Sequence, residues 1–113
     1  MGNLIPTERI YEGDLLSRPL AGLIEFRAQV TGLIRSFRLW GAVAVGSHYF
    51  NVRKSGASLF AGEDRLVLTS AGLVEKTSLA IPVTRGDLVS LDYEVPGSGS
   101  VAAPVVLLME TEE

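Results

Sequence analysis

The most regular pattern in the sequence is DLVSLDYEV, at residues 87–95. Within it apolar and polar side chains alternate, so that in an extended chain the two kinds point to opposite faces. The apolar set is Val89, Leu91, Tyr93 and Val95, and the polar set is Ser90, Asp92 and Glu94. This period of two predicts a β-strand with one face in a core and the other in solvent.

The same period recurs on both sides of this stretch. Further predicted strands lie at residues 22–30, 33–39, 50–53, 58–60, 65–69, 77–83 and 105–109. Turns rich in Gly, Ser and Pro separate them, and no window of about 11 residues favours the helical period. We therefore predict an all-β fold of about eight short antiparallel strands, forming one jelly-roll-like β-sandwich rather than a small barrel.

The chain has 113 residues, a length that suits one domain of about 100–150 residues. Residues 1–21 lack sustained periodicity and contain Pro6 and Pro19. We predict that they form an irregular N-terminal arm that packs on another surface. Residues 22–109 are the predicted β-sandwich domain, and residues 110–113 are predicted to be an acidic tail.

The charge balance argues against nucleic acid and membrane surfaces as partners. The chain has 10 basic and 13 acidic residues, and Glu110, Glu112 and Glu113 account for the whole acidic excess. The remaining residues have no net field to attract phosphate groups. No apolar run approaches the roughly 18 residues that span a bilayer. The hydrophobic content of 47% instead predicts a second buried surface, most simply a subunit interface.

Few residues suit catalysis or metal binding. Cysteine is absent, and His48 is the one histidine. Its neighbour Ser47 would point to the opposite face of a strand, so the two cannot share a proton. Asp92 and Glu94 belong to a face where polar residues are expected in any case. We therefore expect no enzymatic activity, no metal and no cofactor, and we expect His48 to be a structural residue of a strand or loop.

Three further segments follow one another in a recognisable order. They are GSHYFNVRKSGASLF at residues 46–60, RLVL at 65–68 and TRGDLVSLD at 84–92, with a Gly-Ser loop at 97–100. Together they resemble a β-sandwich module common in virion proteins of tailed bacteriophages. Ser55 departs from that pattern, which usually has Asn there, and Val67 stands where a Thr is usual. The resemblance implies a non-enzymatic and often trimeric module of tail fibres, tail tips or capsid decorations.

Among these uses, a capsid decoration (cement) protein fits the chain best. A fibre protein normally joins such a module to a coiled coil or a collagen-like shaft, and neither heptads nor Gly-x-y repeats occur here. We expect a homotrimer, made in the host cytoplasm, that binds the major capsid protein lattice on the outer surface of the virion and stabilises contacts between capsomers. The residues expected to contact the capsid or a neighbouring subunit are Leu4, Ile5, Ile10, Tyr11, Leu15 and Leu16.

An alternative function is a tail-associated or host-surface module that binds glycans. In that case the aromatic rings of Trp40 and Tyr49 would stack on sugar rings. The two hypotheses differ in their partner, since a decoration protein binds a protein lattice in many copies and an adhesin binds a host surface from a few.

Overall fold

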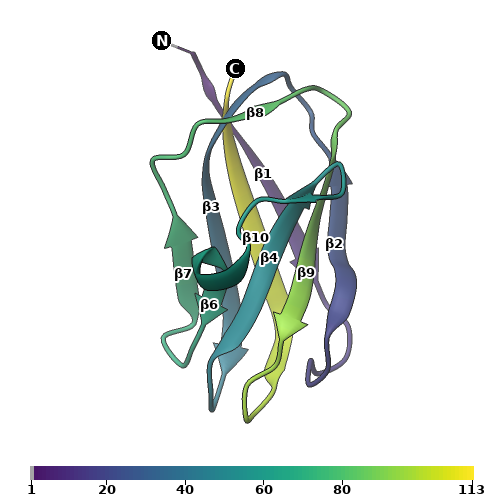
Figure 1. The fold of residues 1–113 in the computed structure, drawn as a ribbon, viewed down its shortest axis with the longest axis vertical. Coiled ribbons are helices and arrows are strands. Elements are labelled where there is room, and N and C mark those ends of the chain that lie inside the picture. The colour runs from purple at the N-terminus through teal and green to yellow at the C-terminus, as the bar shows by residue number, and fades with distance from the viewer. Residues whose placement is uncertain (1) are drawn as a thin grey trace.

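The computed structural model describes residues 2–113 and shows two packed antiparallel sheets (Figure 1). The prediction of an all-β sandwich is confirmed. Its elements are β1 (Leu4–Tyr11), β2 (Leu20–Arg27), β3 (Gly32–Val43), β4 (His48–Lys54), β5 (Ala57–Ser58), the short helix η1 (Gly62–Asp64), β6 (Leu66–Leu68), β7 (Leu73–Lys76), β8 (Ile81–Val83), β9 (Leu88–Val95) and β10 (Val101–Glu112). Among residues 2–113 no helix is long and apolar enough to cross a bilayer.

The strands pair as a set of nested hairpins. Sheet A contains β1, β10, β3 and β7 in that order, with β8 also beside β3. Sheet B contains β2, β9, β4 and β5, with β6 also beside β4. The first strand therefore pairs with the last and the second with the last but one, and the central strands pair with those between them. This connectivity is that of a jelly roll.

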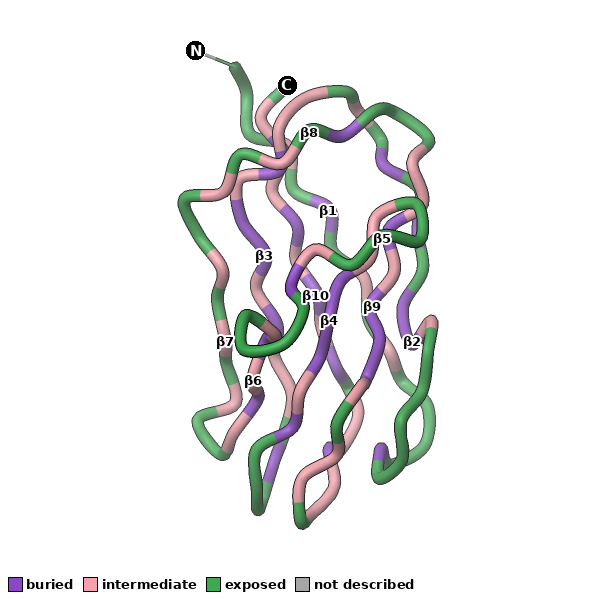
Figure 2. Tube along the Cα trace, viewed as in Figure 1, coloured by how far each residue is buried: buried purple, intermediate pink, exposed green. Residues whose placement is uncertain are grey.

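The core lies between the inner faces of the two sheets (Figure 2). In β9 three of the four predicted inward residues, Val89, Leu91 and Tyr93, are buried, whereas Val95, where the pairing with β4 shifts register, is 40% exposed. The ring of Tyr93 stacks on Phe50 of β4, with 4.9 Å between the ring centroids. The alternation that predicted β9 therefore arises from a strand that lies between two others and covers the core with one face.

The N-terminal segment corrects the predicted irregular arm. Residues 4–11 form the edge strand β1, which pairs with β10 from Leu4 opposite Glu112 to Tyr11 opposite Val105. Thr7, in the middle of the strand, is only 4% exposed. Residue 1 of the predicted arm lies outside the described residues. The segment showed no clear period because each face of β1 mixes apolar and polar side chains, as expected for a strand at the rim of a sheet.

The C-terminal acids correct the predicted tail. Glu110 and Glu112 belong to β10, which has β1 on one side and β3 on the other. Arg38 lies 3.5 Å from the Glu110 carboxylate. The Nε–H of Arg35 donates to Glu112 at 2.8 Å. These acids therefore neutralise arginines of the neighbouring strand.

Two turns contain non-glycine residues with positive φ, and the first of them changed a predicted strand boundary. The strand predicted at 77–83 is interrupted, because Ser78 has a φ of +56°, and β8 begins only at Ile81. In the β4–β5 hairpin Ser55 and Gly56 have φ values of +51° and +85°, as a type I′ turn requires. Asn-Gly is the preferred pair for this turn, so the Asn that is usual in the resembling family would suit the position of Ser55.

Candidate interaction surfaces

Four loops meet at one end of the sandwich, drawn at the bottom of Figure 1, and are called here the lower loops. They comprise residues 12–19, 44–47, 69–72 and 96–100. Only residues 12–19 include charged side chains. Leu15 and Val45 are 64% and 57% exposed, respectively. The other three loops are uncharged, and uncharged loops with exposed apolar side chains have the composition of the centre of a protein interface.

Close backbone contacts fix the relative position of two of these loops. A Cβ atom on Gly97 would lie 2.6 Å from the Ser47 carbonyl oxygen, and one on Gly99 would lie 2.8 Å from the Val45 carbonyl oxygen. Only glycine allows the 44–47 and 96–100 loops to approach this closely. These two loops therefore form one packed unit of defined shape.

His48 contacts the same two loops from the interior of the sandwich. Its side chain is fully buried, and Nε2 lies 3.1 Å from the Val45 carbonyl oxygen. The Gly97 N–H donates to Nδ1 at 3.1 Å, and the Tyr93 hydroxyl lies 2.6 Å from the same nitrogen. Because Val45 offers only an acceptor and Gly97 only a donor, the ring proton is on Nε2 and the Tyr93 hydroxyl donates to Nδ1. His48 thus lies at the start of β4 and links the loops.

This environment changes the pKa of the Tyr93 hydroxyl. Burial raises the pKa of the Tyr93 hydroxyl above its ordinary value, and the backbone amide of Gly97 acts in the opposite direction. The protonated hydroxyl is the form that donates to His48, and burial favours this form further.

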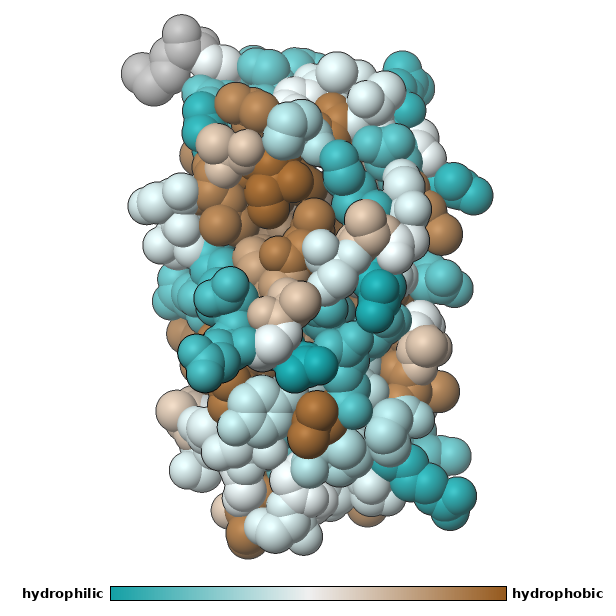
Figure 3. All heavy atoms as spheres, in the orientation of Figure 1, coloured by the Kyte–Doolittle hydropathy of each residue, from teal (hydrophilic) through white to brown (hydrophobic). Residues whose placement is uncertain are grey.

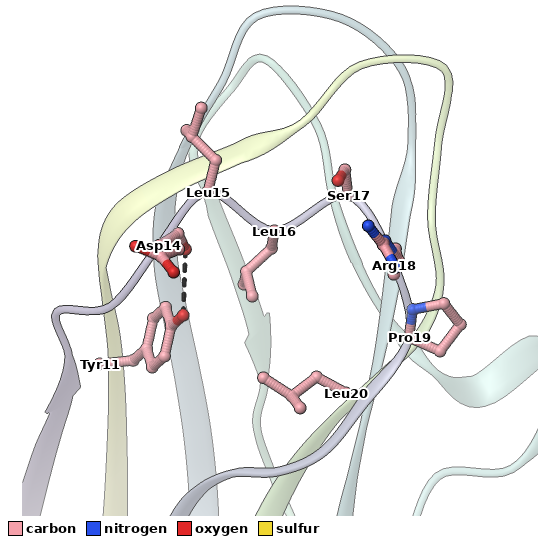
Figure 4. A pocket seen from close by; sticks show the side chains of 8 residues that line it. All are labelled: Tyr11, Asp14, Leu15, Leu16, Ser17, Arg18, Pro19 and Leu20. Atoms are coloured by element: carbon pink, nitrogen blue, oxygen red, sulfur yellow. Dashed lines mark hydrogen bonds between the residues drawn. The ribbon is translucent and has the colours of Figure 1, made fainter.

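The first of the lower loops curves around a shallow hollow of about 380 Å³ (Figure 4). Leu16 and Leu20 point into the curve, whereas Leu15 points away from it. The Tyr11 hydroxyl donates to the Asp14 carbonyl oxygen at 3.0 Å. Leu16 also exchanges two backbone hydrogen bonds with Val101, each of 2.9 Å. The loop is therefore anchored to β10, with Leu15 at its surface.

A row of four apolar side chains crosses the outer face of sheet A, and this set is called here the apolar row. The register places Ile10 opposite Val106, Val106 opposite Trp40 and Trp40 opposite Leu73, so the row crosses β1, β10, β3 and β7. Ile10 is 51% exposed and Leu73 is 41% exposed. Contiguous exposed apolar side chains of this kind mark interaction surfaces.

A second shallow hollow, of about 440 Å³, lies next to the apolar row on the side of the lower loops. It is called here the small-residue hollow, and no charged residue lines it. Its lining is Gly41, Ala42, Val43, Ala44, Ser70, Gly72, Ser100 and Ala102. The row and the hollow together extend from the middle of sheet A to the lower loops.

The structure separates the six residues predicted to contact a capsid or a neighbouring subunit. Leu4 and Ile10 are exposed on β1, and Leu15 is exposed in the first lower loop. Leu16 is buried, and Tyr11 packs against the core. Ile5 is partly buried in β1. Three of the six are therefore available to a partner, and Leu4 lies at the opposite end of the sandwich from Leu15.

The two residues of the alternative glycan site lie on different sheets. Trp40 belongs to the apolar row of sheet A, between Val106 and Leu73. Tyr49 is in sheet B, opposite Val67 on one side and Val95 on the other. The two rings therefore do not come together in one site.

Four charged side chains form a network on the outer face of sheet B, whose middle is hydrophilic in Figure 3. Arg53 donates to Asp92 at 2.8 Å and to Glu94 at 3.2 Å, and Arg65 donates to Glu94 at 2.7 Å. The second oxygen of Asp92 accepts the Gly22 N–H at 2.8 Å. This contact holds the irregular start of β2 against β9, so the carboxylates that the sequence placed on a solvated face have a structural role.

Neighbouring arginines lower the pKa values of two glutamates, Glu94 in this network and Glu112 on sheet A. Partial burial acts to raise the pKa of Glu94, but hydrogen bonds and positive charge from Arg65, assisted by Asn51 and Arg53, outweigh it and lower the pKa. On sheet A, the hydrogen bond and charge of Arg35 lower the pKa of Glu112. Both carboxylates are therefore more acidic in the folded chain than in an unfolded one.

Acid is expected to weaken the fold through Glu94. Because folding lowers its pKa below the ordinary value of about 4.3, its stabilising contribution is present above that value and is lost as the pH falls through the folded pKa. Glu94→Gln should lower the melting temperature at neutral pH by about 4 °C. It should also reduce the loss of melting temperature between neutral pH and pH 3.

Thermal unfolding followed by circular dichroism at both pH values measures these effects. The exposed Glu63 of η1 provides the control substitution, Glu63→Gln. A Glu94→Gln variant that loses as much melting temperature on acidification as the unchanged chain would contradict the assigned role.

The chemical inventory of the described residues adds two facts. Within residues 2–113, no three His, Cys, Asp or Glu side chains are grouped so as to hold a metal ion. Every buried polar side-chain atom of these residues has a hydrogen-bond partner.

The sequence matches no model of a known protein family and no curated protein.

Sequence reasoning missed most of the surface residues that the fold brings together. Val45, Leu73 and Val106 were not singled out, although all three are exposed or partly exposed. Leu73 and Val106 belong to the apolar row, whose residues 10, 40, 73 and 106 become neighbours only when four distant strands pair. The uncharged composition of three of the lower loops was the one signal available in the sequence.

Proposed function

We propose that this chain is a bacteriophage virion structural protein, specifically a capsid decoration (cement) protein that binds the outer capsid surface and stabilises contacts between capsomers. The observation that carries the proposal is the end of the sandwich formed by the lower loops, with Leu15 and Val45 exposed on a rigid, largely uncharged surface. The virion-module resemblance of residues 46–60 and 84–92 supplies the class of partner. No cofactor is required.

The lower loops suit a lattice contact for two physical reasons. Charged residues are depleted from the centres of protein interfaces because burying them is costly. A surface already held by His48 and by close glycine contacts also loses little conformational entropy when it binds. Leu15 would then be the hydrophobic anchor contributed by the first loop, in keeping with its predicted contact role.

The alternative glycan-binding function gains no specific support from the geometry. Trp40 and Tyr49 lie on different sheets, and the neighbours of Trp40 in its row are aliphatic. Sugar recognition combines an aromatic platform with polar groups that bind hydroxyls. A glycan-array signal that Trp40→Ala abolishes would favour this function over the proposed one.

Co-sedimentation with empty heads tests the proposal. The heads are assembled from the major capsid protein encoded in the same genome, and the full chain is added in excess. We expect saturable binding that a Leu15→Asp, Val45→Asp double variant weakens at least about tenfold, because a buried unpaired charge costs more than about 1.4 kcal/mol. Leu4→Asp is the matched control, since Leu4 is equally exposed but lies at the other end. Equal binding by all three chains would contradict the assigned surface.

A further inference from the structure

The hydrogen bonds of the fully buried His48 require an uncharged ring. Nδ1 accepts from the Gly97 N–H and the Tyr93 hydroxyl, and Nε2–H donates to the Val45 carbonyl oxygen. A neutral imidazole has one acceptor and one donor nitrogen, whereas a protonated imidazole has two donors and no acceptor. The contacts that join the 44–47 and 96–100 loops therefore need the neutral form of His48.

The elements packed around the ring bring no acidic side chain to it. The two loops that His48 joins contain no titratable residue. On the neighbouring strands, Leu68 of β6 lies opposite His48 and Tyr93 of β9 contributes its hydroxyl. Across the core, the residues of sheet A that are buried at this end, Val43 and Val101, are apolar. The surroundings of the ring are therefore suited to the uncharged form.

The charged residues nearest along the chain belong to other surfaces. Glu94 follows Tyr93 but binds the arginines on the outer face of sheet B. Glu12, Asp14 and Arg18 of the first lower loop are exposed. None of the ion pairs among residues 2–113 includes His48. A charged ring would thus have no carboxylate partner among the described residues.

We propose that the loop end is an acid-sensitive switch, in which protonation of His48 at Nδ1 releases the 96–100 loop from the 44–47 loop. The added proton takes the lone pair that accepted from Gly97 and Tyr93. Three donors then meet, the ring Nδ1–H, the Gly97 N–H and the Tyr93 O–H, and the Tyr93 oxygen is the one acceptor among them. Unpaired donors and an unpaired charge are both costly when they are buried. Movement of the loop lets water reach them.

The 96–100 loop is the element that can move at the lowest cost. Its residues are exposed or partly exposed, whereas β4, which begins at His48, is paired with β6 and with β9. Opening a surface loop costs less than unfolding the strands beneath it. Because the closed loops bind the neutral ring, their stability is present at neutral pH and is lost as the pH falls.

The switch also regulates the proposed binding surface, and this step rests on the proposed function. The closed loops hold Val45 and the neighbouring backbone in a fixed shape. A surface that must first be ordered binds more weakly than one already held in place. Acid is therefore expected to weaken the attachment of the chain to the capsid.

Amide exchange of Gly97, followed by NMR, tests the switch. The measured quantity is the protection factor, the ratio of the exchange rate in an unstructured chain to the observed rate at the same pH. A free imidazole takes up its proton near pH 6.5, so the protection factor of Gly97 should fall about 20-fold between pH 7 and pH 5. Amides of β3 at the end of the sandwich where the chain termini lie should keep theirs, since Glu94, whose pKa is lowered, remains ionised at pH 5.

His48→Gln is the matched variant, because a side-chain amide also offers an acceptor and a donor but does not titrate. Its protection factor for Gly97 should be the same at pH 7 and pH 5. Constant protection of Gly97 in the unchanged chain overturns the proposal, and so does an equal fall for the β3 amides.

The ring nitrogens keep the test decisive if His48→Gln fails to fold. In the unchanged chain, the ¹⁵N shift of Nδ1 should indicate an acceptor at pH 7 and an N–H in the population that has lost Gly97 protection. A ring that takes up the second proton while Gly97 stays protected overturns the switch.

Co-sedimentation with heads at both pH values measures the consequence for binding. The unchanged chain should bind more weakly at pH 5 than at pH 7, and His48→Gln should not. Equal binding of the unchanged chain at both values overturns the regulation of this surface. A chain that binds heads at neither pH contradicts the proposed function, whereas the exchange measurement decides the switch independently.

Discussion

A chain that lacks residues 1–12 is expected to lose its cooperative fold. This deletion removes the whole of β1, which pairs with β10 along eight residues and contributes the buried Thr7 and the core-packed Tyr11. It would leave β10 as an exposed edge whose inner residues, such as Leu107, lose cover on one side. The free energy lost with β1 is comparable to the whole free energy of unfolding of a domain, about 5–15 kcal/mol.

Two-dimensional NMR and circular dichroism measure this outcome. The truncated chain should give narrow amide dispersion and no thermal transition, whereas removal of residues 1–3, which leaves β1 intact, should preserve both. If the chain without residues 1–12 kept dispersed spectra and a melting temperature close to that of the full chain, this segment would behave as the separate arm that the sequence suggested.

Replacing His48 by Ala is expected to give the largest loss of stability from a single substitution at the loop end. The change leaves a cavity in a fully buried site and deprives the Val45 carbonyl, the Gly97 amide and the Tyr93 hydroxyl of a partner. Cavity formation and unsatisfied polar groups together cost about 3 kcal/mol. For a domain of this length that corresponds to a decrease of about 12 °C in melting temperature.

The local consequence separates this role from general destabilisation. The Gly97 amide should exchange with solvent much faster in His48→Ala, because its acceptor is gone. Amides of β3 at the end of the sandwich where the chain termini lie should keep most of their protection. Ser47→Ala, one residue away and exposed, is the control and should change little. Uniform loss of protection across β3, β4 and β9 would show that His48 is an ordinary core residue and not a link between the loops.

The sequence predicted the fold most accurately where a strand has neighbours on both sides. The strand predicted at 87–95 became β9, between β2 and β4, and its predicted apolar face is buried except at Val95, the last residue of the strand. At the edge of sheet A the same reasoning failed, since Thr7 points inward and Ile10 outward in β1. A period of two appears in the sequence only when one face of a strand is much more buried than the other, and the two faces of an edge strand differ less.

The candidate surfaces were less accessible to sequence reasoning. The apolar row depends on the register of four strands, and the partners of His48 lie 45 and 49 residues away at Tyr93 and Gly97. The acidic end of the chain was misinterpreted because the arginines that pair with it, Arg35 and Arg38, are on β3, more than 70 residues earlier. The hydrophobic content of the chain gave no position for an apolar surface, and only the pairing of the strands located one.

The copy number of this chain in purified virions tests the central claim most directly. Under the proposal a phage encodes this chain, so particles of that phage are purified on a density gradient. The ratio of this chain to the major capsid protein is then measured by quantitative mass spectrometry. A decoration protein should be present in a number comparable to that of the major capsid protein, because it repeats with the capsomers. Absence from the particles, or a few copies that remain with isolated tails, would contradict the account.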